Sequence, residues 1–201
     1  MSPISRRTLV GAAIATPALV RAQAAAPTRP HILMQTHAGP ITMEMASDRA
    51  PISCANFLRY VDTRRLDGAA FYRALKVQPD PLAGLVQGGV TDGAKLLAPI
   101  AHEPTTKTGL KHVEGAVSLA RLAPGTARAD FFISVGDFPS FDADPSQPGD
   151  NLGFAVFGRV TDGMDTVRAI LTSPVSPTAG EGPMKGQMLD PKIRILTVRR
   201  V

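Results

Sequence analysis

The chain has 201 residues, 44% hydrophobic and 19% charged, a balance that excludes intrinsic disorder and allows a sizeable core in one compact domain. Aromatic residues make up only 5%, with no Trp, whereas Gly and Pro number 18 each, which favours short strands and turns over a helix bundle. The formal net charge is +5, but three arginines and no acid lie in residues 1–24, which leaves +2 for the remainder. This weak charge, with no basic run interleaved with aromatics, argues against nucleic-acid binding.

The N-terminal residues predict a targeting segment. Residues 5–9 read SRRTL, a twin-arginine pattern, and the mildly apolar run over 9–20 is shorter than the roughly 20 apolar residues that cross a bilayer. Residues 22–24 read AQA, a small-x-small cleavage pattern. We expect a twin-arginine signal peptide over 1–24, a flexible entry over 25–30, a periplasmic or otherwise exported location, and no stable membrane insertion of the mature chain. The alternatives are an ordinary secretory signal or a disordered tail.

Two amphipathic helices are expected. The first starts near Pro51, with Cys54, Phe57, Leu58 and Val61 on its inner face. Cys54 is the single cysteine, so no internal disulfide is available, and a small buried residue is favoured over a reactive thiol. The second helix is expected over 164–171 with Asp162 as its N-cap.

The remaining apolar segments read as strands separated by Gly, Pro and Asp. In residues 41–45, for example, Ile and Met alternate with Thr and Glu, which is typical of a half-buried strand. The expected strands are 31–36, 41–45, 69–75, 85–88, 115–120, 130–135, 153–160 and 193–198. About eight strands with two helices predict a mostly β protein, either a closed barrel or a sandwich capped by helices.

Alternation within residues 131–135 separates two phenylalanines. Phe131, Ile133 and Val135 share one face, which we expect to be core, while Phe132 points to the other face. A phenylalanine outside the core indicates a ligand surface or a second packing layer.

Residues 71–89, FYRALKVQPDPLAGLVQGG, place Arg73 among aromatic and apolar neighbours. An unpaired cation is costly to bury, so Arg73 is either part of a structural ion pair or directed at a ligand.

Several motifs in a fixed order resemble the cyclophilin family of peptidyl-prolyl cis-trans isomerases, specifically the exported bacterial type. They are Phe71-Tyr72-Arg73, Gln87-Gly88-Gly89, Ser118-Leu119-Ala120, Asp130-Phe131-Phe132-Ile133 and Phe154 to Val160 followed by Gly163-Met164. The resemblance covers nearly all of residues 31–201. It implies a closed eight-stranded antiparallel β-barrel capped by two α-helices and an isomerase that acts on X–Pro bonds during protein folding.

The resemblance also implies roles for individual residues. Arg73 matches the catalytic arginine, which would stabilise the twisted amide, and Gln87 matches the glutamine that orients it. The walls of the proline pocket correspond to Phe132, Leu85 and Phe141, and Ala120 with the backbone of Arg121 corresponds to an edge strand that pairs with the substrate. The implied partners are proline-containing polypeptides, the expected state is a monomer, and no cofactor or metal is needed.

The chain departs from the family pattern around the pocket. Tyr72 replaces the family's histidine, and Gly84 stands where a pocket phenylalanine is expected, at the end of a longer segment over 76–84. Leu82 or Pro81 are the candidates to fill that space. Ser140 stands at a position often held by Trp or Phe, and Phe154 replaces the pocket histidine.

Two further points stay open in the sequence. Asp130 either meets substrate or pairs with Arg73 or Arg128. His102, Glu103 and His112 could suggest a metal, but their pattern lacks ligand geometry, and surface or turn roles are favoured.

Two classes of function fit these residues. The first is an active prolyl isomerase. The second is a proline-binding module or chaperone with weak or no catalysis, which the altered pocket suggests.

Overall fold

The computed structural model describes residues 29–77, 79–80 and 82–201. Its strands are β1 (His31–Thr36), β2 (Gly39–Met45), β3 (Ala70–Lys76), β4 (Gly84–Gly89), β5 (Ala116–Leu119), β6 (Phe131–Val135), β7 (Ala155–Asp162), β8 (Val175–Ser176) and β9 (Met188–Arg200). The expected signal peptide lies outside the described residues. Of the expected entry segment, Arg29 and Pro30 are described, and the Arg29 Nε donates to Asp48 Oδ1 at 2.8 Å.

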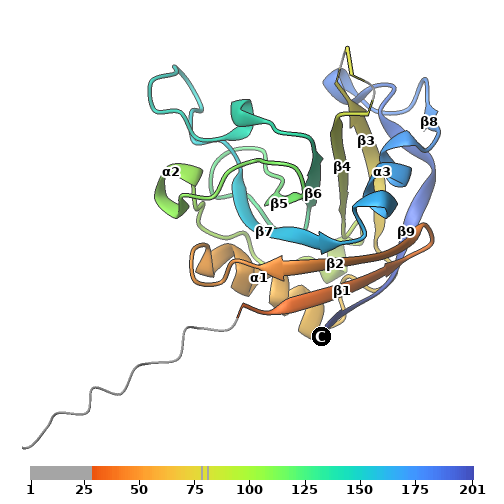
Figure 1. Cartoon of the computed structure of the whole chain (residues 1–201), viewed down its shortest axis with the longest axis horizontal. Helices are drawn as coiled ribbons and strands as arrows, with labels where there is room; N and C mark the ends of the chain where they lie inside the picture. The colour runs from red at the N-terminus through yellow and green to blue at the C-terminus, as the bar shows by residue number, and fades with distance from the viewer. Residues whose placement is uncertain (1–28, 78, 81) are drawn as a thin grey trace, which may run out of the picture.

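The strands form one closed antiparallel barrel (Figure 1). Their order is β1-β2-β7-β5-β6-β4-β3-β9, and pairing of β1 with β9 closes the ring of eight. The two-residue β8, which was not predicted, pairs with β9 outside this ring. The predicted eight-stranded barrel is therefore confirmed.

Both predicted helices are present, as α1 (Pro51–Asp62) and α3 (Met164–Thr172), with an unpredicted single turn, α2 (Thr105–Thr108). Asp162 is not the N-cap of α3, because it is the last residue of β7. The N-cap is Gly163 at φ 91°, where a Cβ atom would overlap the Pro40 carbonyl oxygen. The tight strand-to-helix turn therefore requires glycine and leaves no place for a side-chain cap.

One continuous core fills the barrel and extends to the helices. The inner face of α1 is buried as predicted, and the Phe57 ring lies 5.5 Å from Phe131 and 5.1 Å from Phe157. The Cys54 thiol donates to the Phe157 carbonyl at 3.0 Å, and burial raises the pKa of this thiol to about 12. Cys54 is therefore a small buried residue without appreciable thiolate at neutral pH.

No helix in the described part of the chain is long and apolar enough to cross a membrane, and the longest, α1, has 12 residues.

The N-terminus of α1 is capped by a residue far away in the chain. Ala50 provides no side-chain cap, and the buried Glu103 takes that role. Its Oε2 accepts hydrogen bonds from the backbone N–H and the hydroxyl of Ser53, both at 2.7 Å, and its Oε1 accepts from the Ile52 N–H at 3.2 Å. A carboxylate at this end satisfies unpaired N–H groups and complements the helix dipole. The surface or turn role expected for Glu103 is therefore wrong.

Substitution Glu103→Gln should lower the free energy of unfolding by about 2 kcal/mol, because an amide cannot accept all three hydrogen bonds and lacks the charge. Urea titration at pH 7 measures this change. The control, Glu181→Gln, alters an exposed acid and should stay within about 0.5 kcal/mol of wild type. Equal midpoints for all three proteins would contradict the capping role.

Candidate active site

The site begins with a bulge in β3. Phe71 pairs with Gly88 and Arg73 pairs with Gln87, so Tyr72 is an extra residue on β3. Phe71 and Ala74 belong to the buried core, which leaves Tyr72 and Arg73 together on the outer face of the barrel wall. A bulge re-aims side chains in this way because it breaks the strict alternation of a strand. Two consecutive polar side chains therefore reach the same site.

Two glutamines hold the guanidinium of Arg73. The Arg73 Nη1 donates to Gln87 Oε1 and its Nε donates to Gln187 Oε1, each at 2.8 Å. Burial lowers the pKa of Arg73, Tyr72 opposes this shift, and no described carboxylate contributes to it. Arg73 therefore keeps an uncompensated charge, and the structural ion pair considered for it is not formed with any described residue. Sequence reasoning missed Gln187, because it lies 114 positions from Arg73.

The orientation of the Gln87 amide is set from both ends. Its Oε1 faces Arg73, and its Nε2 donates to the Tyr72 hydroxyl at 2.8 Å. Asp130 lies beside the same hydroxyl, and burial raises the pKa of both Tyr72 and Asp130. Any Cβ atom on Gly89 would overlap Asp130 Oδ1, so the second glycine of the Gln-Gly-Gly motif makes room for this acid. Asp130 is thus a neighbour of Tyr72, not an ion-pair partner of Arg73 or Arg128.

An aromatic pocket of about 250 Å³ opens beside Arg73. It is lined by Arg73, Leu75, Leu85, Gln87, Ala120, Arg121, Phe132, Phe141, Phe154 and Met184. The rings of Phe132, Phe141 and Phe154 meet edge to face, with centroids 5.4–5.8 Å apart. The three residues that sequence analysis assigned to a pocket wall, Leu85, Phe132 and Phe141, all lie here, as does Phe154. The pocket therefore combines apolar walls with one charged edge.

The segment over 76–84 does not fill this pocket. Leu82 is 65% exposed and is not among the lining residues, while Pro81 lies outside the described residues. Gly84 faces away from the pocket lining, and a Cβ there would overlap the Leu75 carbonyl oxygen. The backbone of β3 and β4 therefore excludes any side chain at this position. Met184, from the distant 3-10 turn η3 (Gly182–Met184), lines the pocket instead.

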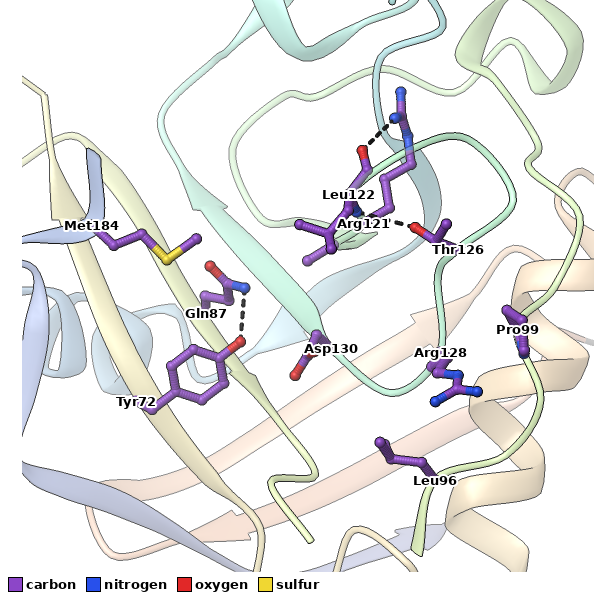
Figure 2. Close-up of a pocket in the computed structure, with 11 residues that line it drawn as sticks. Tyr72, Gln87, Leu96, Pro99, Arg121, Leu122, Thr126, Arg128, Asp130 and Met184 are labelled. Atoms are coloured by element: carbon purple, nitrogen blue, oxygen red, sulfur yellow. Dashed lines mark hydrogen bonds between the residues drawn. The ribbon is translucent and has the colours of Figure 1, made fainter. Parts of the chain in front are cut away.

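A second cavity of about 590 Å³ adjoins the aromatic pocket and shares Gln87, Ala120, Arg121 and Met184 with it (Figure 2). The figure shows Tyr72 and Gln87 on one side of this adjacent cavity and the Arg121–Thr126 loop on the other, with Asp130 between them. A groove of this kind is suited to an extended chain that places one side chain in each cavity. The described residues therefore form a site with two compartments.

The Ala120–Arg121 segment is not part of an edge strand, which corrects the expectation for it. β5 ends at Leu119 and is paired with β6 and β7, and the Ala120 N–H donates to the Asp130 carbonyl at 2.9 Å. A peptide could meet this segment only beyond the end of β5. The Arg121 side chain is used internally, because its Nη2 donates to Asp150 Oδ1 at 2.9 Å and its guanidinium lies over the Phe154 ring.

A hydrogen-bonded group of three residues, His112, Asp142 and Ser118, lies behind the aromatic wall of the pocket. The His112 ring stacks on Phe132, its Nδ1 lies 2.8 Å from Asp142 Oδ1, and its Nε2 lies 3.0 Å from the Ser118 hydroxyl. This arrangement has the composition of a hydrolytic triad, but Ser118 is 0% exposed and cannot reach a substrate. These hydrogen bonds therefore orient the His112 ring, which packs against both Phe132 and Phe141. The surface or turn role expected for His112 is wrong, because this residue is buried. His102 contacts the Leu152 carbonyl oxygen through Nε2 at 3.0 Å.

Comparison with known proteins identifies the enzyme class. A peptidyl-prolyl cis-trans isomerase of Acinetobacter baylyi is 34% identical over 162 residues, which cover 79% of this chain and 79% of that protein. Peptidyl-prolyl cis-trans isomerase A of Dickeya dadantii is 32% identical and covers 76% of this chain and 78% of its own length. These relatives and the site define an isomerase.

The family follows from a match over most of the chain. The family model for "Cyclophilin type peptidyl-prolyl cis-trans isomerase/CLD" matches residues 31–199. A solved cyclophilin-type isomerase of Cryptosporidium parvum has the same fold, with a TM-score of 0.66, 19% identity and coverage of 86% of this chain and 98% of its own. The chain belongs to the cyclophilin family of peptidyl-prolyl cis-trans isomerases.

The buried His112 predicts a pH dependence of stability. Burial lowers the pKa of His112 against the opposing effect of Asp142, so the folded protein binds this proton less readily than the unfolded chain. Stability should therefore fall as pH decreases below about 6.5, the ordinary pKa of histidine. Urea midpoints at pH 7, 6 and 5 should decrease less steeply for His112→Gln than for wild type. His37→Gln, which alters an exposed histidine, is the control, and parallel curves for His112→Gln and wild type would contradict the prediction.

Proposed function

We propose that Arg73 catalyses rotation about X–Pro bonds by stabilising the twisted amide while the proline ring occupies the aromatic pocket. The observation that carries this proposal is the charge of Arg73, which two neutral amides hold at the edge of an apolar cavity. Two of the five guanidinium N–H donors are engaged, and the other three have no partner among the described residues. They are the donors that a bound amide would meet.

The chemistry needs no covalent step. Amide resonance creates a barrier of about 20 kcal/mol, and twisting the bond returns electron density to the nitrogen and weakens the resonance. Hydrogen bonds from Arg73 to the proline carbonyl oxygen and toward the ring nitrogen would favour the twisted form over the planar one. A rate gain of about 10⁵ requires roughly 7 kcal/mol of such differential binding. The apolar walls exclude water and strengthen these bonds.

The second candidate function is a proline-binding module or chaperone with weak or no catalysis. It was suggested by the missing side chain at Gly84 and by Ser140, which is exposed. Gly84 faces away from the aromatic pocket, and Met184 lines that pocket together with the three phenylalanine rings, which favours the catalytic function. Binding of an Ala-Pro peptide in calorimetry without turnover in the isomerase assay would favour the module.

Substitution Arg73→Ala should lower kcat/KM for an Ala-Pro peptide at least about 100-fold, because such losses follow removal of one transition-state donor. A protease-coupled isomerase assay measures this change. Arg159→Ala, which removes an arginine that is 65% exposed on β7, should retain wild-type activity. If Arg73→Ala is as active as Arg159→Ala, the proposed mechanism is wrong.

We further propose that the enzyme assists the folding of exported proteins. The support is the SRRTL pattern with its short apolar run and AQA sequence, which is the composition of a twin-arginine signal. A periplasmic enzyme that acts on proline-containing polypeptides follows from this signal together with the family.

Replacement of both Arg6 and Arg7 by Lys should retain the full-length precursor inside the cell, because the arginine pair is the recognition signal of this export route. Fractionation of a bacterial host and mass spectrometry of the exported form measure the outcome. The exported wild type should begin at Ala25, and Arg29→Lys should be exported normally as the control. Efficient export of the double-lysine variant would refute the route.

A further inference from the structure

The segment Gly182–Gln187 approaches the active site from the connection between β8 and β9. It begins with η3 and is closed by hydrogen bonds from Gln187 N–H to the Met184 carbonyl at 3.1 Å and from Gly186 N–H to the Ala179 carbonyl at 3.0 Å. The Ala74 N–H donates to the Gln187 carbonyl at 2.9 Å, which ties the segment to β3 directly after Arg73. Its backbone position is therefore fixed relative to the arginine.

Gln187 is held so that its acceptor faces Arg73. Its Nε2 donates to the Pro183 carbonyl at 2.6 Å, which leaves Oε1 to accept from the Arg73 Nε at 2.8 Å. Together with the bond from Nη1 to Gln87, this fixes two edges of the planar guanidinium. Because both partners are uncharged, they orient Arg73 without neutralising it. A carboxylate in either place would compete with a substrate carbonyl for the charge.

Met184 lies where the two compartments of the site meet. It lines both the aromatic pocket and the adjacent cavity, and it is 39% exposed although it is a large apolar side chain. Figure 2 shows its thioether directed toward Gln87. Methionine adapts its shape to the surface it meets, because its side chain is unbranched and flexible. An exposed methionine in this place is suited to contact a bound peptide.

We propose that Gln187 is a positioning residue for Arg73 and that Met184, on the same segment, is a specificity-determining residue that contacts the substrate. This inference rests on the proposed function of Arg73. Gln187 acts through the arginine, so its loss should affect the chemical step. Met184 meets substrate in both the ground state and the transition state, so its loss should mainly weaken binding.

Gln187→Leu removes the acceptor and retains a side chain of similar size. We expect its kcat to fall about tenfold or more with KM within about twofold of wild type, because a lost hydrogen bond to a charged group is of that magnitude. Gln187→Glu retains an acceptor for the Arg73 Nε but adds a charge that competes with the substrate carbonyl, so its kcat should stay below that of wild type although Arg73 remains held. Gln147→Leu, at an exposed position before β7, is the matched control and should equal wild type.

A spectroscopic measurement separates positioning from general stability. In wild type, the Arg73 Nε–H should exchange with solvent at least about tenfold more slowly in ¹⁵N NMR than that of the exposed Arg128, and the signal is assigned by its absence in Arg73→Ala. This protection should be lost in Gln187→Leu and retained in Gln187→Glu. The wild-type measurement alone tests the contact if Gln187→Leu does not fold.

Met184→Ala should raise KM for an Ala-Pro peptide about tenfold with kcat within about twofold of wild type, because a shortened apolar wall weakens binding. Leu196→Ala is the control, since Leu196 is an apolar residue of β9 that is 42% exposed and lines neither cavity, and it should leave KM unchanged.

The outcomes separate this inference from the proposed function. Full activity of Arg73→Ala would contradict both the proposed function of Arg73 and this inference. If Arg73→Ala is inactive while Gln187→Leu has wild-type kcat and an unchanged Arg73 signal, only the role of Gln187 is wrong. An unchanged KM in Met184→Ala would likewise overturn only the role of Met184.

Discussion

A half-buried cation held by neutral partners is the constraint on which the rest of the site depends. Arg73 loses part of its hydration, and two amide oxygens at 2.8 Å replace the lost water contacts without cancelling the charge. An acid in the same place would stabilise the folded protein more strongly and leave less attraction for a substrate. The arrangement therefore gives up some stability and leaves the charge of Arg73 available to a ligand, as the proposed function requires.

The barrel provides this arrangement through local departures from regular structure. The bulge at Tyr72 brings two polar side chains to one face, and the missing Cβ of Gly89 admits Asp130 beside the Tyr72 hydroxyl. Behind the aromatic wall, His112 connects Asp142 and Ser118 and stacks on Phe132. Each departure orients a side chain of the site, and the regular core of the barrel makes these positions rigid.

Alternation of apolar residues and the order of the motifs were enough to predict the barrel, both long helices and the core face of β6. They also predicted that Arg73, Gln87 and Phe132 belong to one site. It could not predict contacts between segments far apart in the chain. Gln187 reaches Arg73 across 114 positions, and Glu103 caps α1 across 50. Local spacing carries no signal for either contact. The edge strand expected for Ala120 and Arg121 was wrong because β5 ends at Leu119 and is paired on both sides, whereas contact of these two residues with a substrate stays a prediction.

The position of Gln187 just before β9 has a consequence for synthesis. β9 follows the other strands in the chain, yet it pairs with β1 to close the ring and with β3 beside Arg73. Neither the closed barrel nor the hydrogen bond between Gln187 and Arg73 can form until Gln187 and β9 have left the ribosome. The growing chain therefore lacks the complete site until β9 has been synthesised, because closure joins residues of high sequence separation.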